Sequence, residues 1–329
     1  MSTPLSRLRA RLHAGFLLLA LCWTAAAAAA QAWPDRPVYV VVPYAPGGIA
    51  DIAARAVAQK LAVNTGQSFI VENKPGADTR IGTEQVARAK PDGYTLLLAG
   101  GGFAVNNALF NNLPYDTARD FMPVGLVVSN PLVLVVGPTQ PFHSVRDLLD
   151  AAAKPDQHVT LASGGRGTLS HMSMELLSSM AKVHITHVPY RGGSAFVGDV
   201  VGGVVSGIFE NPSSAMPLIQ SGKYRALAVT SAQRSPALPG VPTMIESGVP
   251  GFEVTNWFGM FMPAGVPEPV AAQIAAQLQR ALDDPALKAR FARDGVLVGG
   301  PMRAAFGKFV AGETAKWGDI VRSRGIRAD

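Results

Sequence analysis

VYVVVPYAPGGIADIAARAVAQKLAVNTG, residues 38–66, joins an apolar run to a helical pattern through two adjacent glycines. The run over 38–44 predicts a buried strand, and residues 50–64 predict a helix that Gly66 ends. Gly47 and Gly48 carry no side chain, so a bound group can come close to the backbone there. A phosphate, a reacting carbonyl and a small carboxylate are the three candidates, and each implies a different kind of protein.

Strands and helices alternate along the rest of the chain, and this alternation predicts parallel sheets that helices cover on both faces. The further strands are expected in 68–73, 94–100, 158–164, 185–190, 205–211 and 224–231. The further helices are expected over 79–90, 144–153, 168–181, 194–202, 213–221, 267–283, 285–294 and 302–324.

Two long extended runs, near 122–137 and 252–263, divide the chain into three parts. The simplest account is two α/β lobes that these runs connect as crossing segments. The first lobe is predicted from residues 33–133 plus 256–329, and the second from 134–255. Ligands of open α/β sheets bind at the carboxyl ends of strands, and strands of both predicted lobes end in glycine or polar clusters. The sequence therefore predicts a ligand cleft between the lobes.

Residues 1–32 have the order of a secretory signal peptide. Arg7, Arg9 and Arg11 precede a short apolar core, and the small-residue sequence AQA ends at Ala32. The strongly apolar part is shorter than a membrane-spanning helix needs, so a cleaved signal is favoured over an anchor. Cys22, the only cysteine, lies in this segment, which leaves the mature chain without a thiol. The prediction is a periplasmic protein that begins near Trp33.

The charge pattern does not indicate nucleic-acid binding. The formal net charge is +6 for the full chain and falls to +3 once the three arginines of the signal are removed. The remaining basic residues are dispersed among acids and form no run. A mildly basic chain is compatible with an anionic small ligand.

The familiar catalytic and cofactor motifs are absent. No Gly-Lys is followed by Ser or Thr, and G-x-G-x-x-G does not occur, so we expect no nucleotide cofactor. G-x-S-x-G and H-E-x-x-H are also missing, and we expect neither catalysis nor a metal. An exported hydrolase with an unusual site is the rival class. His184 and His187 have odd spacing on a strand and are interpreted as structural.

The remaining explanation of the glycine loops is that their backbone N–H groups bind an anion. Helix N-termini offer unpaired N–H groups and a partial positive charge, and glycines let a carboxylate reach them. PGGIAD and SGGRGTLS share the order strand, glycines, helix start, and one lies in each predicted lobe. His171, in the first turn of the helix after the second of these, is a further candidate. The alternative is that the glycines only form tight turns. The strand-end clusters add Tyr44, Gly101, Gly102, Tyr190 and Glu210 to the candidate ligand-binding residues.

Long stretches of the sequence resemble the Bug family, the extracytoplasmic solute-binding receptors of tripartite tricarboxylate transporters, of the TctC-like type. The stretches that carry the resemblance include WPDRPVYVVVPYAPGGIADIAAR, VENKPGADTRIGTEQVARAKPDGYTLLLAG, HVPYRGGSA and RALAVTSAQRSPALPGVPTMIESGVPGFEVTNWFGMFMPAGVP. The resemblance is collinear over essentially all of the mature chain. It implies a two-lobed periplasmic binding protein of type II-like architecture, with two mixed or mostly parallel sheets joined by two crossing strands. It also implies closure on a small carboxylate without chemistry on it.

The resemblance carries over to the candidate loops residue by residue. The first loop is Ala45, Pro46, Gly47 and Gly48, with Ile49, Ala50 and Asp51 beginning the helix; Asp51 matches the acid that can meet the amino group of an amino-acid ligand. The second loop, residues 163–168, is Ser163, Gly164, Gly165, Arg166, Gly167 and Thr168. The sequence departs from the family at Ile49 and Ala50, where hydroxyl residues are frequent, and at Arg166, where Asn is frequent. The departures leave open which carboxylate binds and whether Arg166 reads a second negative group or is a surface arginine.

The resemblance also implies the partners. Membrane permease subunits of a tripartite tricarboxylate transporter are expected, and a sensor domain is the alternative. The chain is expected to act as a monomer.

Overall fold

The computed structural model describes residues 33–110, 112–190 and 195–326. Residues 33–36 belong to a separate N-terminal unit, and every element below lies within residues 37–329. The predicted signal peptide, residues 1–32, lies outside the described residues, as does the expected start of a helix at residue 194.

The decisive stretch folds as predicted. β1 (Val38–Val42) is buried along most of its length, and α2 (Ile49–Thr65) follows it. The helix ends at Gly66, whose φ of 73° is the left-handed conformation that glycine adopts without strain. The register of β1 with β2 (Phe69–Asn73) and β3 (Thr95–Gly100) is parallel on both sides.

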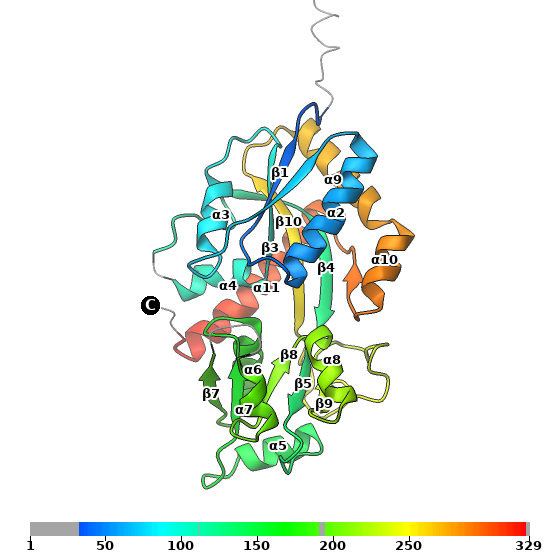
Figure 1. Cartoon of the computed structure of the whole chain (residues 1–329). Helices are drawn as coiled ribbons and strands as arrows, with labels where there is room; N and C mark the ends of the chain where they lie inside the picture. The colour runs from blue at the N-terminus through cyan, green and yellow to red at the C-terminus, as the bar shows by residue number, and fades with distance from the viewer. Residues whose placement is uncertain (1–32, 111, 191–194, 327–329) are drawn as a thin grey trace, which may run out of the picture. The chain divides into compact units, whose positions relative to one another are not determined.

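The chain forms two mixed sheets, each flanked by helices, which is the two-lobed α/β architecture expected (Figure 1). The first has the strand order β11-β4-β10-β3-β1-β2 and contains β4 (Phe121–Pro131), β10 (Thr255–Pro263) and β11 (Leu297–Val298). The second has the order β7-β6-β8-β5-β9, from β5 (Val133–Val136), β6 (Thr160–Ser163), β7 (Thr186–Pro189), β8 (Gly207–Glu210) and β9 (Arg225–Val229). The exact lobe boundaries at 133–134 and 255–256 stay a prediction.

The helices flank these sheets (Figure 1). With the first sheet go α3 (Arg80–Ala87), α4 (Gly101–Leu109), α9 (Glu268–Leu282), α10 (Pro285–Ala292) and α11 (Arg303–Ser323). With the second go α5 (Val145–Ala152), α6 (Leu169–Ala181), α7 (Val197–Val201) and α8 (Pro212–Gln220).

The extended runs that the sequence singled out do connect the sheets. Residues 121–136 form β4 of the first sheet and β5 of the second, with Leu132 between them, and β9 of the second sheet leads back to β10 of the first. β4 and β10 pair antiparallel, so these crossing strands introduce the antiparallel part of a sheet whose other neighbours, β1, β2 and β3, are parallel.

One helix was not expected. The three glycines after β3 indicated only a strand end, but Gly101 and Gly102 begin α4. Phe103 and Leu109 of this helix are buried, and α11 packs along it. Tertiary packing therefore outweighs the low helix propensity of glycine.

Candidate functional site

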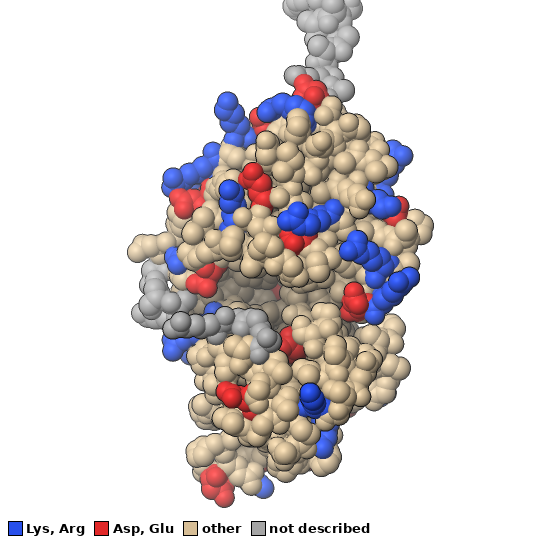
Figure 2. Space-filling view, viewed as in Figure 1, with Lys and Arg blue, Asp and Glu red and all other residues tan. Residues whose placement is uncertain are grey.

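Two adjoining cavities lie where strands of the two sheets end and helices begin. One has a volume of about 1050 Å3 and the other of about 310 Å3. Both are lined by Tyr44, Thr168, Leu169, Asn256 and Phe258. Figure 2 shows the molecule hollowed at this level. Elements of both sheets therefore contribute to one connected space, large enough for a small organic ligand.

Four helices begin at the walls of this space. The lining includes Gly48 and Ile49 at the start of α2, Gly101 and Gly102 at the start of α4, Leu169 and Ser170 at the start of α6, and Asn211 and Ser213 at the start of α8. The first N–H groups of a helix have no intrahelical partner, and they carry the positive end of the helix dipole. Their convergence makes the space favourable for a negatively charged group.

The first loop is fixed by the acid that follows it. Asp51 accepts a hydrogen bond from the Gly47 N–H at 3.0 Å and pairs with Arg55 at 2.9 Å. Burial would raise the pKa of Asp51, but the hydrogen bonds from Arg55 and Gly47 outweigh it and hold that pKa below its ordinary value. The carboxylate thus orders the loop from behind, while Gly47, Gly48 and Ile49 line the larger cavity.

Tyr44 forms part of the wall between the cavities. The Gly100 N–H donates to the Tyr44 hydroxyl oxygen at 3.0 Å. The Tyr44 ring packs edge-on against the Phe258 ring, with their centroids 5.5 Å apart. Burial raises the pKa of Tyr44 to about 12, so the phenol stays neutral. Phe258 and Asn256 lie on β10, which the sequence had identified only as a crossing segment.

The glycine N–H groups of the second loop donate to nearby side chains. The N–H of Gly165 donates to Ser163 Oγ at 3.1 Å, and that of Gly167 donates to His171 Nδ1 at 3.0 Å. The Gly164 N–H donates to Ser170 Oγ at 3.3 Å. Three of the glycine N–H groups that were candidates for anion capture are therefore engaged by side chains of the loop and of the first turn of α6. The open groups on this side are those of the first turn of α6, at Leu169 and Ser170, which line the larger cavity.

Three asparagines join the crossing strands to the second sheet. Asn211 Oδ1 accepts hydrogen bonds from Asn130 of β4 at 3.1 Å and from Asn256 of β10 at 2.9 Å. Asn130 and Asn256 also face each other in the β4–β10 register. Asn256 also lines both cavities, so the crossing strand β10 forms part of their wall.

Glu210 is one of two acidic residues that line the larger cavity, with Asp294. It ends β8 and is 9% exposed, and one of its carboxyl oxygens accepts the Asn211 N–H at 2.8 Å. Burial raises the pKa of Glu210 to about 7, against the opposing effect of that hydrogen bond. The group is therefore partly protonated near neutrality.

The predicted ligand-binding residues divide into two sets. Those that line the cavities are Tyr44, Gly47, Gly48, Ile49, Gly101, Gly102, Gly164, Arg166, Gly167, Thr168 and Glu210. Those that the structure places beside the lining rather than in it are Ala45, Pro46, Ala50, Asp51, Ser163, Gly165, His171 and Tyr190. Asp51, Ser163 and His171 are buried behind the two loops, and the hydroxyl of Tyr190 donates to Asp199.

Some residues that line the cavities were not predicted from the sequence. The smaller cavity is bounded by Asp78, Thr79, Asn106, Leu109 and Phe110. Ala77, Asp78 and Thr79 have successive positive φ values of 47°, 51° and 73°, which is unusual for residues other than glycine. The sequence signal was the segment PGADT, but nothing local showed that it folds against α4.

Neither a metal site nor a membrane span appears in the described part of the chain. Across residues 33–110, 112–190 and 195–326, no group of three or more His, Cys, Asp or Glu side chains is placed to hold a metal ion. Within the same ranges, no helix combines the length and the apolar character that crossing a membrane requires.

Known proteins match this chain over most of its length. The family model described as tripartite tricarboxylate transporter family receptor matches residues 53–326. Protein BugT of Bordetella pertussis is 34% identical over 315 residues, covering 94% of this chain and 96% of that protein. The structure of the periplasmic binding protein BugD is 36% identical with a TM-score of 0.76, covering 90% of this chain and 100% of that one. A structure of R. palustris Rpa4515 with adipate is 33% identical with a TM-score of 0.78, covering 89% and 99%.

Proposed function

Because the chain belongs to the tripartite tricarboxylate transporter receptor family, we propose that it captures a small organic carboxylate in the periplasm and delivers it to the permease subunits of such a transporter. The observation that carries the proposal is the convergence of four helix N-termini on one cleft between the sheets. The candidate ligands are dicarboxylates, tricarboxylates, aromatic acids and amino acids. Secretion through a cleaved signal peptide over residues 1–32 is part of the proposal.

Release of the ligand unchanged distinguishes this function from that of an exported hydrolase. Ser163 lies 2.6 Å from His187, a pair that could suggest a nucleophile and its base, but Ser163 is fully buried and bonds within its own loop. A buried hydroxyl of this kind is not accessible to a substrate. The pair is better explained as support for the second loop.

Ligand-induced closure is the first expected result. A thermal-shift screen with adipate, malate, citrate, benzoate and glutamate should identify a ligand. Solution scattering should then show a fall in the radius of gyration at saturating ligand, because only the closed form brings both loops to the anion. The ligand should be recovered intact after long incubation. Turnover of the ligand would favour the interpretation as an exported hydrolase. A screen in which no carboxylate binds would contradict the proposed function.

Arg166 is expected to select a second negative group. It lines the smaller cavity, whose other walls include the apolar side chains of Leu109, Phe110 and Phe258. A guanidinium beyond an apolar passage suits a carboxylate at the far end of a short carbon chain. Arg166→Ala should weaken adipate binding about tenfold and hexanoate binding less than about twofold, as measured by calorimetric titration.

Arg146→Ala provides the control for this change. Arg146 pairs with Asp150 on the exposed face of α5, and its side chain is 83% exposed. We expect it to leave the affinity for both acids unchanged. Equal losses for adipate and hexanoate in Arg166→Ala would leave Arg166 without a role in selection.

A further inference from the structure

The C-terminal helix reaches from the first sheet to the helix that follows the second loop. Near its start, Phe306 packs with Trp257 and Phe261 in the apolar core of the first sheet. Near its end, Trp317 and Ile320 belong to the core that contains Met172 and Leu177 of α6, among other residues. The last turn of α11 is therefore held at a fixed place beside α6.

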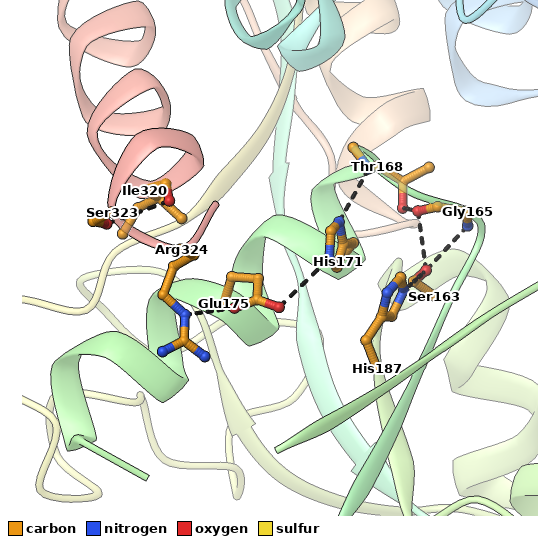
Figure 3. Close-up of polar contacts among 10 residues, drawn as sticks. Ser163, Gly165, Thr168, His171, Glu175, His187, Ile320, Ser323 and Arg324 are labelled. Carbon is orange, nitrogen blue, oxygen red and sulfur yellow. Dashed lines mark hydrogen bonds and ion pairs between the residues drawn. The ribbon is translucent and has the colours of Figure 1, made fainter. Parts of the chain in front are cut away.

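A chain of polar contacts runs from this last turn to the second loop (Figure 3). Arg324 Nε lies 2.8 Å from Glu175 Oε2, and Glu175 Oε1 lies 3.6 Å from His171 Nε2. The other ring nitrogen, His171 Nδ1, accepts the Gly167 N–H at 3.0 Å. Side-chain exposure falls along the chain from 30% at Arg324 to 13% at Glu175 and 5% at His171. The contacts thus lead from the surface to the back of the loop.

The hydrogen bond at Nδ1 decides which tautomer is assigned to His171. Because Nδ1 accepts a hydrogen bond, the ring proton of His171 is assigned to Nε2, which faces Glu175. Burial would raise the pKa of Glu175, but its contacts with His171 and Arg324 outweigh burial and hold that pKa below its ordinary value. An ionised Glu175 orients the ring, and the ring in turn holds the Gly167 amide.

The flat face of the His171 ring is also supported, by a second imidazole. The His187 ring stacks on His171 with centroids 3.9 Å apart, and His187 Nε2 lies 2.6 Å from Ser163 Oγ. Ser163 donates to the Gly165 carbonyl and accepts the Gly165 N–H. Burial lowers the pKa of His187 to about 4, so this stacked imidazole is neutral near pH 7. The second loop is therefore held from behind at Gly165 and at Gly167.

We propose that Arg324 and Glu175 are positioning residues that act through His171 to hold the second loop in the shape that receives the ligand. Neither residue lines either of the two cavities described above. Arg324 and Glu175 are 149 residues apart in the chain, so the contact between them depends on the path of α11. The proposal rests on the proposed function, since it assigns the contact chain a role in carboxylate capture.

Hydrogen exchange in the ligand-free protein tests the first half of this proposal. Arg324→Gln removes the charge that orients Glu175, and His171→Leu removes the acceptor of the Gly167 N–H. Both should speed exchange of the Gly167 amide about tenfold or more. The matched control is Arg322→Gln, because Arg322 pairs with Asp319 in the same last turn but both side chains are largely exposed. Unchanged Gly167 exchange in Arg324→Gln and His171→Leu would overturn the proposal.

Adipate titration tests the second half. Arg324→Gln should weaken adipate binding about tenfold with little change in melting temperature. His171→Leu should weaken it more, and His171→Asn should recover most of the affinity, because an amide oxygen at the same branch can accept the Gly167 N–H. Faster exchange with wild-type adipate affinity would overturn the positioning role. If the unmodified protein bound no carboxylate at all, the proposed function would fail, and the exchange result alone would decide whether the contact chain holds the loop.

Discussion

Gly48→Val is expected to reduce carboxylate affinity at least about a hundredfold while leaving the protein folded. Gly48 has a φ of −78°, which any L-residue adopts, and the nearest atom to an added Cβ is the Ala45 carbonyl oxygen at 4.0 Å. An added Cβ therefore meets no protein atom closer than 4.0 Å, at a residue that lines the larger cavity beside the start of α2. It would occupy the approach to the helix N–H groups that the ligand needs. The free energy of unfolding should fall by about 1 kcal/mol, because Gly48 is the N-cap of α2 and valine is less favourable than glycine at that position.

Gly48 differs in backbone conformation from other glycines of the two loops. The φ angle is positive at Gly47 (86°) and Gly165 (133°) but not at Gly48. Valine at Gly47 or Gly165 would strain the backbone as well as alter the pocket, so loss of binding there would be ambiguous. Gly48 is the cleaner position because only the bound ligand is affected.

Gly240→Val is the matched control for this experiment. Gly240 has no atom within 4 Å of an added Cβ and does not line either cavity. Calorimetric titration with adipate beside a melting curve should show normal affinity for Gly240→Val and none for Gly48→Val. Wild-type affinity in a folded Gly48→Val protein would refute anion capture at this loop.

Carboxylate affinity is expected to fall about tenfold between pH 6 and pH 8. Glu210 lines the larger cavity, and burial raises its pKa to about 7. Below that pH the carboxyl is mostly neutral and does not oppose an anion in the same cavity. Above it the carboxylate repels the anion, so binding must take up a proton and weakens as the pH rises. Adipate is a suitable probe, because both of its carboxyl groups are largely ionised throughout this range.

The same group affects stability in a defined direction. The folded pKa of Glu210 is raised above the unfolded value of 4.5, so the folded state holds the extra proton between these two values. The contribution of Glu210 to the free energy of unfolding should therefore fall as the pH rises from 4.5 to about 7, whereas His187, with its lowered pKa, contributes in the opposite direction. Denaturant titrations across this range should show the Glu210 contribution as a falling difference in the free energy of unfolding between the wild type and Glu210→Gln.

Glu210→Gln is also the decisive variant for binding. The amide keeps an oxygen that accepts the Asn211 N–H but carries no charge at any pH. We expect its adipate affinity to be flat between pH 6 and pH 8, whereas Glu253→Gln, at an exposed position before β10, should keep the wild-type slope. A wild-type affinity that does not change with pH would exclude Glu210 from the ligand's surroundings.

The sequence by itself predicted the elements whose signals are local. The apolar run of β1, the glycines after it and the helical period of α2 lie within residues 38–66, and all three formed as expected. The two crossing runs were likewise visible as long extended stretches. Periodicity and turn chemistry depend on neighbours in the chain, so they can be read without a fold.

Only the tertiary structure decided how the site is assembled. The start of α4 at Gly101 depends on packing against α11, and the hydrogen bonds of Asn211 depend on where two distant strands cross. The pKa of Glu210 depends on burial that no sequence window reveals. Arg324 and Glu175 meet only because the chain, after passing through both sheets, brings the end of α11 back to α6. Contacts between residues far apart in the chain are set by the path of the backbone, which local propensity does not specify.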